Sequence, residues 1–176
     1  MPARTLISRP LISVEEYLRT SYRPDCDYVD GEVVERNLGE RDHAWLQTAV
    51  ASYFFVRRGQ WNITVLTEMR VRVKAKRFRI PDICVILGDT EERILTKPPF
   101  ICVEILSPED RLLRVQQRIA DYFEMGVPYV WVLDPETKQA YTATPAEGLR
   151  ELKSGVLRTE NPALEVPLSE LFAERK

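Results

Sequence analysis

The pattern of apolar and polar residues predicts two helices in the first third of the chain. In residues 42–58 apolar side chains recur every three or four positions, the period of an amphipathic helix, and Gly59 follows as its expected end. In residues 13–19 Ser13 and Glu16 form a capping box, which predicts a short helix of about two turns.

Strand patterns occupy most of the middle of the chain. Residues 27–34 alternate around an Asp-Gly pair, which predicts a β-hairpin. Residues 63–73 alternate apolar and charged side chains, as a half-buried strand does. Residues 78–87 and 100–106 are apolar on both faces apart from one acid each, which is typical of central strands covered on both sides.

The remaining elements complete a recognisable order of helices and strands. A third helix is expected to start at Ser107 as N-cap and to end at Gly126, followed by a strand over 127–133. Residues 139–176 indicate a polar hairpin and a short closing helix near 168–172. The order αβββαβ predicts an α/β protein with three layers, in which helices flank a mixed sheet.

Composition limits the kinds of function that are open to the chain. Its 176 residues predict one domain, 1–176, and 25 basic against 27 acidic residues exclude a basic nucleic-acid coat protein. His43 is the one histidine, the three cysteines form no CxxC pair, and no Gly-rich phosphate loop occurs. We expect a cytoplasmic protein, because we find no secretory leader and no membrane-spanning run.

Two acids interrupt the most apolar strands. Asp82 shares a face with Cys84, and Glu104 shares a face with Cys102. A carboxylate in such a position costs several kcal/mol unless it is paired or binds a metal. The two acids could therefore meet at a divalent cation, or each could pair with an arginine or reach solvent at a strand end.

These residues resemble a known family. The spacing of Asp82 and Glu104 is similar to that of the PD-(D/E)XK nuclease superfamily, and the chain over residues 10–175 resembles its Uma2 (DUF820-like) branch. The resemblance implies a restriction-endonuclease-like core with an N-terminal hairpin and C-terminal β additions. It rests on Asp30-Gly31-Glu32, on His43, on Arg79-Ile80-Pro81-Asp82, on Val103-Glu104-Ile105-Leu106-Ser107-Pro108 and on Gly126-Val127-Pro128-Tyr129-Val130-Trp131.

The resemblance also implies a chemistry. Asp82 and Glu104 would bind Mg²⁺ or Mn²⁺ for the cleavage of DNA phosphodiester bonds. Leu106 stands at the position of the motif lysine. The resemblance implies that Uma2 proteins often supply this lysine from the following helix instead, and the matching position in this chain is Arg118. Arginine stays protonated at physiological pH, so Arg118 can neutralise a phosphate but cannot act as a general base.

Two further residues are candidates for the same site. Glu68 is a candidate third metal ligand, and the alternative is an ion pair with Arg70 or Arg72 on its own strand. His43 opens a helix that borders the active site in the superfamily and is a candidate for orienting the attacking water. Its alternative is a structural or solvent-facing role.

Basic residues near the two acids are candidate DNA contacts. Arg111 and Arg114 lie on the same side of the third predicted helix as Arg118, and Arg79 ends a basic cluster at 74–79. The alternative for both groups is a solvated surface.

Two functions remain open. The first is a Mg²⁺-dependent endonuclease that acts on DNA, for which a homodimer is expected because two active sites cut two strands. The second is a catalytically inactive binding or dimerisation module that keeps the fold, which the loss of the motif lysine at Leu106 favours.

Overall fold

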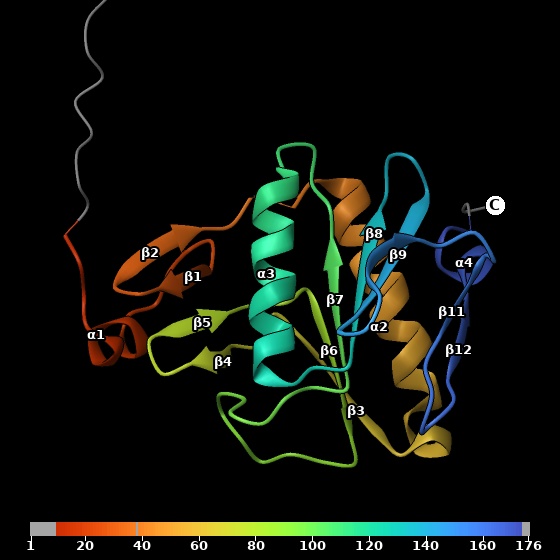
Figure 1. Cartoon of the computed structure of the whole chain (residues 1–176), viewed down its shortest axis with the longest axis horizontal. Helices are drawn as coiled ribbons and strands as arrows, with labels where there is room; N and C mark the ends of the chain where they lie inside the picture. Colours follow the sequence, from red (N-terminus) through yellow and green to blue (C-terminus); the bar gives the residue numbers. More distant parts are fainter. Residues whose placement is uncertain (1–9, 38, 174–176) are drawn as a thin grey trace, which may run out of the picture.

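A computed structural model describes residues 10–37 and 39–173, and its helices and strands form three layers (Figure 1). The helices are α1 (Val14–Arg19), α2 (Arg41–Trp61), α3 (Leu112–Met125) and α4 (Leu168–Leu171). The strands are β1 (Cys26–Val29), β2 (Glu32–Glu35), β3 (Ile63–Thr67), β4 (Val71–Lys74), β5 (Arg77–Arg79), β6 (Ile83–Leu87), β7 (Ile101–Ile105), β8 (Tyr129–Asp134), β9 (Gln139–Thr144), β10 (Gly148–Glu151), β11 (Val156–Arg158) and β12 (Glu165–Pro167).

The central layer is a six-stranded mixed sheet in the order β10-β9-β8-β7-β6-β3. Strands β7 and β8 are parallel, and the other neighbours are antiparallel. Helix α3 lies over one face of this sheet and α2 lies on the other (Figure 1). This arrangement confirms the α/β class with three layers that the sequence predicts. Within the described residues, no helix has the length and apolar character to span a membrane.

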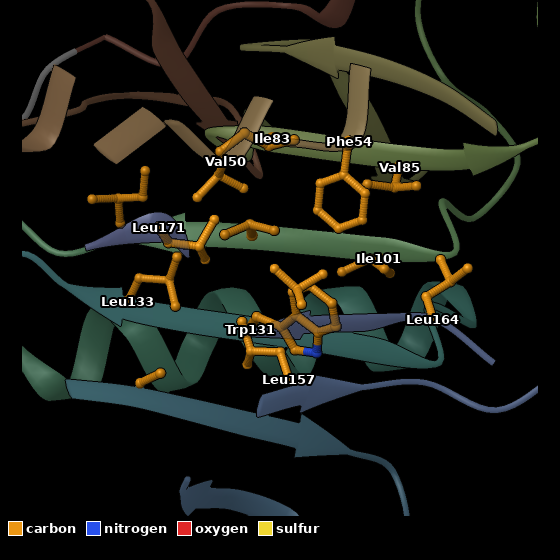
Figure 2. Packing of buried hydrophobic residues seen from close by; sticks show 14 of the residues in the cluster. Val50, Phe54, Ile83, Val85, Ile101, Trp131, Leu133, Leu157, Leu164 and Leu171 are labelled. Carbon is orange, nitrogen blue, oxygen red and sulfur yellow. The ribbon is translucent and has the colours of Figure 1, made fainter. Parts of the chain in front are cut away.

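Two apolar cores hold these layers together. Between α2 and the sheet, Phe54 stacks on Trp131 with ring centroids 5.9 Å apart, and Ile83 and Ile101 pack beside them (Figure 2). The other core lies between α3 and the opposite face of the sheet and includes the buried Cys84 and Cys102. Removal of this apolar surface from water is the main stabilising contribution to the fold.

A second sheet, in the order β2-β1-β5-β4, lies beside the main sheet and next to α1 (Figure 1). Strands β1 and β2 form the predicted hairpin, and Asp30 and Gly31 adopt the positive φ angles that its two-residue turn requires. The N-cap bond of the predicted capping box is present too, since the Ser13 side chain accepts a hydrogen bond from the Glu16 N–H at 3.1 Å.

Two strand predictions were wrong in the same way. Residues 63–73 do not form one strand, because Glu68 has a φ of 50° and turns the chain between β3 and β4. Residues 78–87 are divided into β5 and β6 by the connection 80–82, in which Pro81 has no N–H for a sheet ladder. In both places the chain passes from one sheet to the other.

Two predicted helix ends also need correction. Gly59 lies inside α2, which ends at Trp61 and is capped by Asn62 in the left-handed conformation. Helix α3 begins at Leu112 and not at Ser107, because the Asp110 carboxylate accepts hydrogen bonds from the Ser107 N–H and hydroxyl and closes a separate turn. The end of α3 at Gly126, the strand that follows and the C-terminal hairpin and closing helix are confirmed.

Candidate active site

Asp82, directly before β6, lies opposite Glu104 on the neighbouring strand β7. The β6–β7 register pairs Ile83 with Val103, so the next position along pairs Asp82 with Glu104. Directly opposite residues of an antiparallel pair have Cβ atoms about 5 Å apart. Both acids are buried, each with 2% of its surface exposed. The two acids that the sequence singled out therefore form one carboxylate pair.

Groups from three parts of the chain surround the Asp82 carboxylate. Arg36, just after β2, donates from Nη2 to Oδ1 at 2.7 Å, and Nε2 of His43 lies 3.4 Å from the same oxygen. The backbone N–H of Ile105 donates to Oδ2 at 2.7 Å. Burial alone would raise the pKa of Asp82, but the hydrogen bond from His43 and the charge of Arg36 outweigh it, so the pKa is lowered.

Glu104 has a different environment. Arg118 donates from Nη1 to Oε2 at 3.1 Å, and the Tyr122 hydroxyl donates to Oε1. Burial raises the pKa of Glu104 to about 7, against the opposing effect of the Arg118 charge. The pair thus contains one carboxylate that stays ionised and one that titrates near neutral pH.

Helical spacing explains how α2 and α3 reach the pair. Arg118 and Tyr122 are four residues apart and lie on the same face of α3. His43 lies in the first turn of α2, and Gln47, one turn later, donates from Nε2 to the backbone oxygen of Asp82 at 3.1 Å. Burial would lower the pKa of His43, but the Asp82 carboxylate outweighs burial and raises the pKa.

A buried network of ion pairs lies next to the carboxylate pair and links it to the small sheet. Arg79 donates to Asp121 on α3 at 2.8 Å and to Asp27 on β1 at 2.9 Å. Arg77 donates to the other oxygen of Asp121 at 2.8 Å, and Nε of Arg118 lies 3.6 Å from Asp27. This alternation of charges attaches α3 to the small sheet.

The structure brings four of the predicted site residues together and places a fifth nearby. His43 contacts Asp82, and Arg118 contacts Glu104, the two acids that lie opposite each other. Glu68 is exposed and lines a pocket of about 300 Å³ together with Asp82 and His43. The ion pairs found within residues 10–37 and 39–173 do not include Glu68, so the alternative pairing with Arg70 or Arg72 is not observed.

The predicted DNA contacts differ in position. Arg79 is 6% exposed and its guanidinium faces Asp27 and Asp121, so this position corrects the expectation that it contacts DNA. Its basic cluster looked solvated in sequence because the partners are distant along the chain. Arg111 is the N-cap of α3, and Arg114 is exposed on the first turn of that helix.

Sequence reasoning missed several residues of the site. Tyr122 belongs to the apolar stripe of the third predicted helix, so the sequence pattern indicates a packing residue and no hydrogen bond from its hydroxyl. Arg36 follows the hairpin without any periodic pattern. Asp27 alternates with apolar neighbours in β1, and an acid between two buried residues was a usable signal for a buried charge.

Carboxylates are the ligands that a hard divalent cation prefers, so the pair fits Mg²⁺ or Mn²⁺ in donor type. The present hydrogen bonding of the two carboxylates does not fit a bound metal ion. Both oxygens of Asp82 and both oxygens of Glu104 already accept protein donors, and two of these donors are guanidinium groups. Across the part of the chain that the structure describes, no three His, Cys, Asp or Glu side chains are grouped to hold a metal ion.

A mixed sheet between helical layers, with a Glu on one central strand opposed to an Asp directly before the next, defines a restriction-endonuclease-like α/β protein. The chain belongs to the Uma2 family, described as "Putative restriction endonuclease", whose family model matches residues 14–174. Proteins of this restriction-endonuclease-like type generally use divalent metal ions.

One solved structure is similar over nearly the whole chain. It is a "putative nuclease belonging to DUF820" from Anabaena variabilis, with a TM-score of 0.78 and 21% sequence identity over 92% of this chain and 98% of that one. At this identity the likeness shows the shared fold. No protein of curated function matches the sequence.

Proposed function

We propose that this protein is an endonuclease that hydrolyses DNA phosphodiester bonds at the Asp82–Glu104 pair with the help of Mg²⁺ or Mn²⁺. The observation that supports it is the pair itself, in which two buried carboxylates, one on β7 and one directly before β6, lie opposite each other in a restriction-endonuclease-like fold. Burial of two acids side by side costs free energy, and a catalytic use accounts for that cost better than stability does.

The charged neighbours suit a phosphodiester substrate. Arg118 stays protonated, so we assign it the neutralisation of the scissile phosphate and not proton abstraction. His43 reaches Asp82 from the first turn of α2 and has a pKa above its ordinary value of 6.5. We assign it the orientation of the attacking water. Asp82 and Glu104 would hold a divalent cation only once a guanidinium group has left them, and the cation would then stabilise the charge that develops at phosphorus.

Surface residues complete the proposal. Arg111 and Arg114 at the start of α3 are the proposed phosphate contacts on either side of the cleaved bond. Acids such as Glu32, Glu35 and Glu109 line the hollow beside Arg114, so DNA binding at low affinity is expected. A homodimer remains part of the proposal, and light scattering of the purified protein tests it.

A supercoiled-plasmid nicking assay with Mg²⁺ and with Mn²⁺ tests the function. The wild-type protein should convert supercoiled to open-circular DNA, and Asp82→Ala and Glu104→Gln should each reduce the rate at least about a hundredfold. Arg41→Gln, which alters an exposed arginine outside the site, is the matched control. Nicking by the wild type that does not exceed that of Asp82→Ala would contradict the proposal.

A binding module is the second candidate, and one observation favours it. Leu106 stands at the position of the motif lysine, while Arg36 and Arg118 already neutralise the two carboxylates. This candidate requires DNA or another partner to bind without any metal. Equal DNA affinity with EDTA and with Mg²⁺, together with no nicking, would favour it over the endonuclease.

A further inference from the structure

We propose that Arg36 is an internal cation that competes with a divalent metal ion for Asp82, so that metal binds the Asp82–Glu104 pair when the Arg36 side chain leaves it. The inference rests on the proposed function, because it concerns the same two carboxylates. It assigns a role to a residue that the sequence did not single out.

The contact itself is the first argument. Nη2 of Arg36 lies 2.7 Å from Oδ1 of Asp82, and the two side chains are 12% and 3% exposed. A metal ion on that oxygen would lie within a few ångströms of the guanidinium carbon. Two positive charges at such a distance repel strongly where water and salt screen them little.

The charge balance around the pair is the second argument. Asp82 is neutralised by Arg36, and Glu104 is neutralised by Arg118 at 3.1 Å. A divalent ion added to this arrangement would leave an excess of positive charge in a buried place, which is costly. One of the two arginines therefore has to move before a metal ion binds.

Arg36 is the less constrained of the two arginines, because the ion pairs found among the described residues join it to Asp82 alone. Arg118 lies within α3 and is also 3.6 Å from the buried Asp27, which keeps it in place. Arg36 lies in the connection between β2 and α2, and it lines the pocket of about 300 Å³ described above. Asp25 and Glu68 line the same pocket and offer new counter-charges to the displaced guanidinium.

Isothermal titration with Mn²⁺ on the intact protein tests the competition. Arg36→Gln should bind Mn²⁺ with a Kd at least tenfold lower than the wild type, because the competing charge is gone. Arg41→Gln, an exposed arginine with a side chain 86% exposed, is the matched control and should stay within twofold of the wild type. Adding Asp82→Asn to Arg36→Gln should abolish the gain.

Several results would overturn the competition. They are an unchanged or weaker Mn²⁺ affinity in Arg36→Gln, a gain that survives Asp82→Asn, or no Mn²⁺ binding in any variant. Circular dichroism checks that the variant is folded. If Arg36→Gln does not fold, a wild-type crystal soaked in Mn²⁺ decides, since the ion should lie at the pair with Arg36 turned away. An ion bound there beside an unmoved Arg36, or no ion, would be contrary to the proposal.

Plasmid nicking separates this inference from the proposed function. Tighter Mn²⁺ binding by Arg36→Gln without nicking in any protein would support the competition and reject the endonuclease. Metal-dependent nicking that requires Asp82, with Mn²⁺ affinity unchanged in Arg36→Gln, would support the endonuclease and reject the competition.

Discussion

The backbone N–H of Ile105 donates a hydrogen bond to Oδ2 of Asp82 at 2.7 Å. Because Ile105 directly follows Glu104 on β7, this bond fixes one site carboxylate to the strand that bears the other. The Asp82 carboxylate is thus held against β7 by a backbone donor and not only by flexible side chains. A preorganised pair of this kind is what electrostatic catalysis requires.

The stability of the protein should fall as pH rises from about 4.5 to about 7. Glu104 has a pKa of about 7 in the folded protein against 4.5 in the unfolded chain, so the folded state binds more protons in this window. Above pH 7 this contribution levels off. His43, whose pKa is also raised, acts in the same direction above pH 6.5, because its contribution is lost as it deprotonates. Urea unfolding at a series of pH values measures both effects.

Glu104→Gln isolates the part due to the carboxylate. The fall in unfolding free energy between pH 5 and pH 8 should be smaller in this variant than in the wild type by roughly 1 to 3 kcal/mol. Asp82 does not contribute in this window, because its lowered pKa places its loss of stability at acid pH, below 3.8. Parallel pH profiles for the two proteins would show that Glu104 is not the titrating group.

Asp121→Asn should destabilise the protein by about 3 kcal/mol or more. The change removes the charge that two arginines, Arg77 and Arg79, share at 2.8 Å, and it leaves the buried Arg79 incompletely paired. Glu165→Gln, which breaks the exposed pair with Arg158, is the control and should cost less than about 1 kcal/mol. Chemical denaturation compares the two, and equal effects would mean that burial of the network adds nothing.

Tyr122→Phe should cost about 1 to 2 kcal/mol of stability and raise the pKa of Glu104 further. The hydroxyl donates to Oε1 in a fully buried place, and its loss leaves that oxygen with an unmet hydrogen bond. Tyr141→Phe, whose hydroxyl donates to Gln139 on an exposed surface at 3.2 Å, provides the comparison. Carbon-13 NMR of the Glu104 carboxyl measures the pKa, and a lower value would contradict the assigned direction of this bond.

Arg114→Gln should weaken DNA binding by a similar factor for all sequences. A phosphate contact contributes through counterion release, so the slope of log affinity against log salt should decrease by about 1. Fluorescence anisotropy over a range of NaCl concentrations measures it. Arg150→Gln, on the distant β10, should leave the slope unchanged. An equal salt slope for Arg114→Gln and Arg150→Gln would show that Arg114 does not contact a DNA phosphate.

The sequence was sufficient for the class of fold and for singling out the two buried acids, Asp82 and Glu104. Long apolar runs such as that of β7 identify central strands, and an acid inside such a run has few structural explanations. The boundaries between sheets were not predictable in the same way. The alternation of apolar and charged residues continues through Glu68, although its positive φ turns the chain there. The sequence pattern of residues 63–73 therefore looked like one strand where the structure has two.

Pairing over long sequence separations explains what was missed. Arg36 and Asp82 are 46 residues apart, and no local pattern connects them. Arg79 looked like part of a solvated basic cluster because its buried partner Asp27 lies 52 residues earlier. A cluster of basic residues has the same sequence pattern whether water or a distant carboxylate neutralises it.

The small sheet determines how a minimal version of this protein should be designed. A chain shortened to start at α2 would keep both Asp82 and Glu104, and its main sheet would look complete. It would lack Asp27 and Arg36, which β1 and the segment after β2 contribute to the site. Measurements on such a fragment would describe a site with altered ionisation, so the first forty residues belong in any functional study.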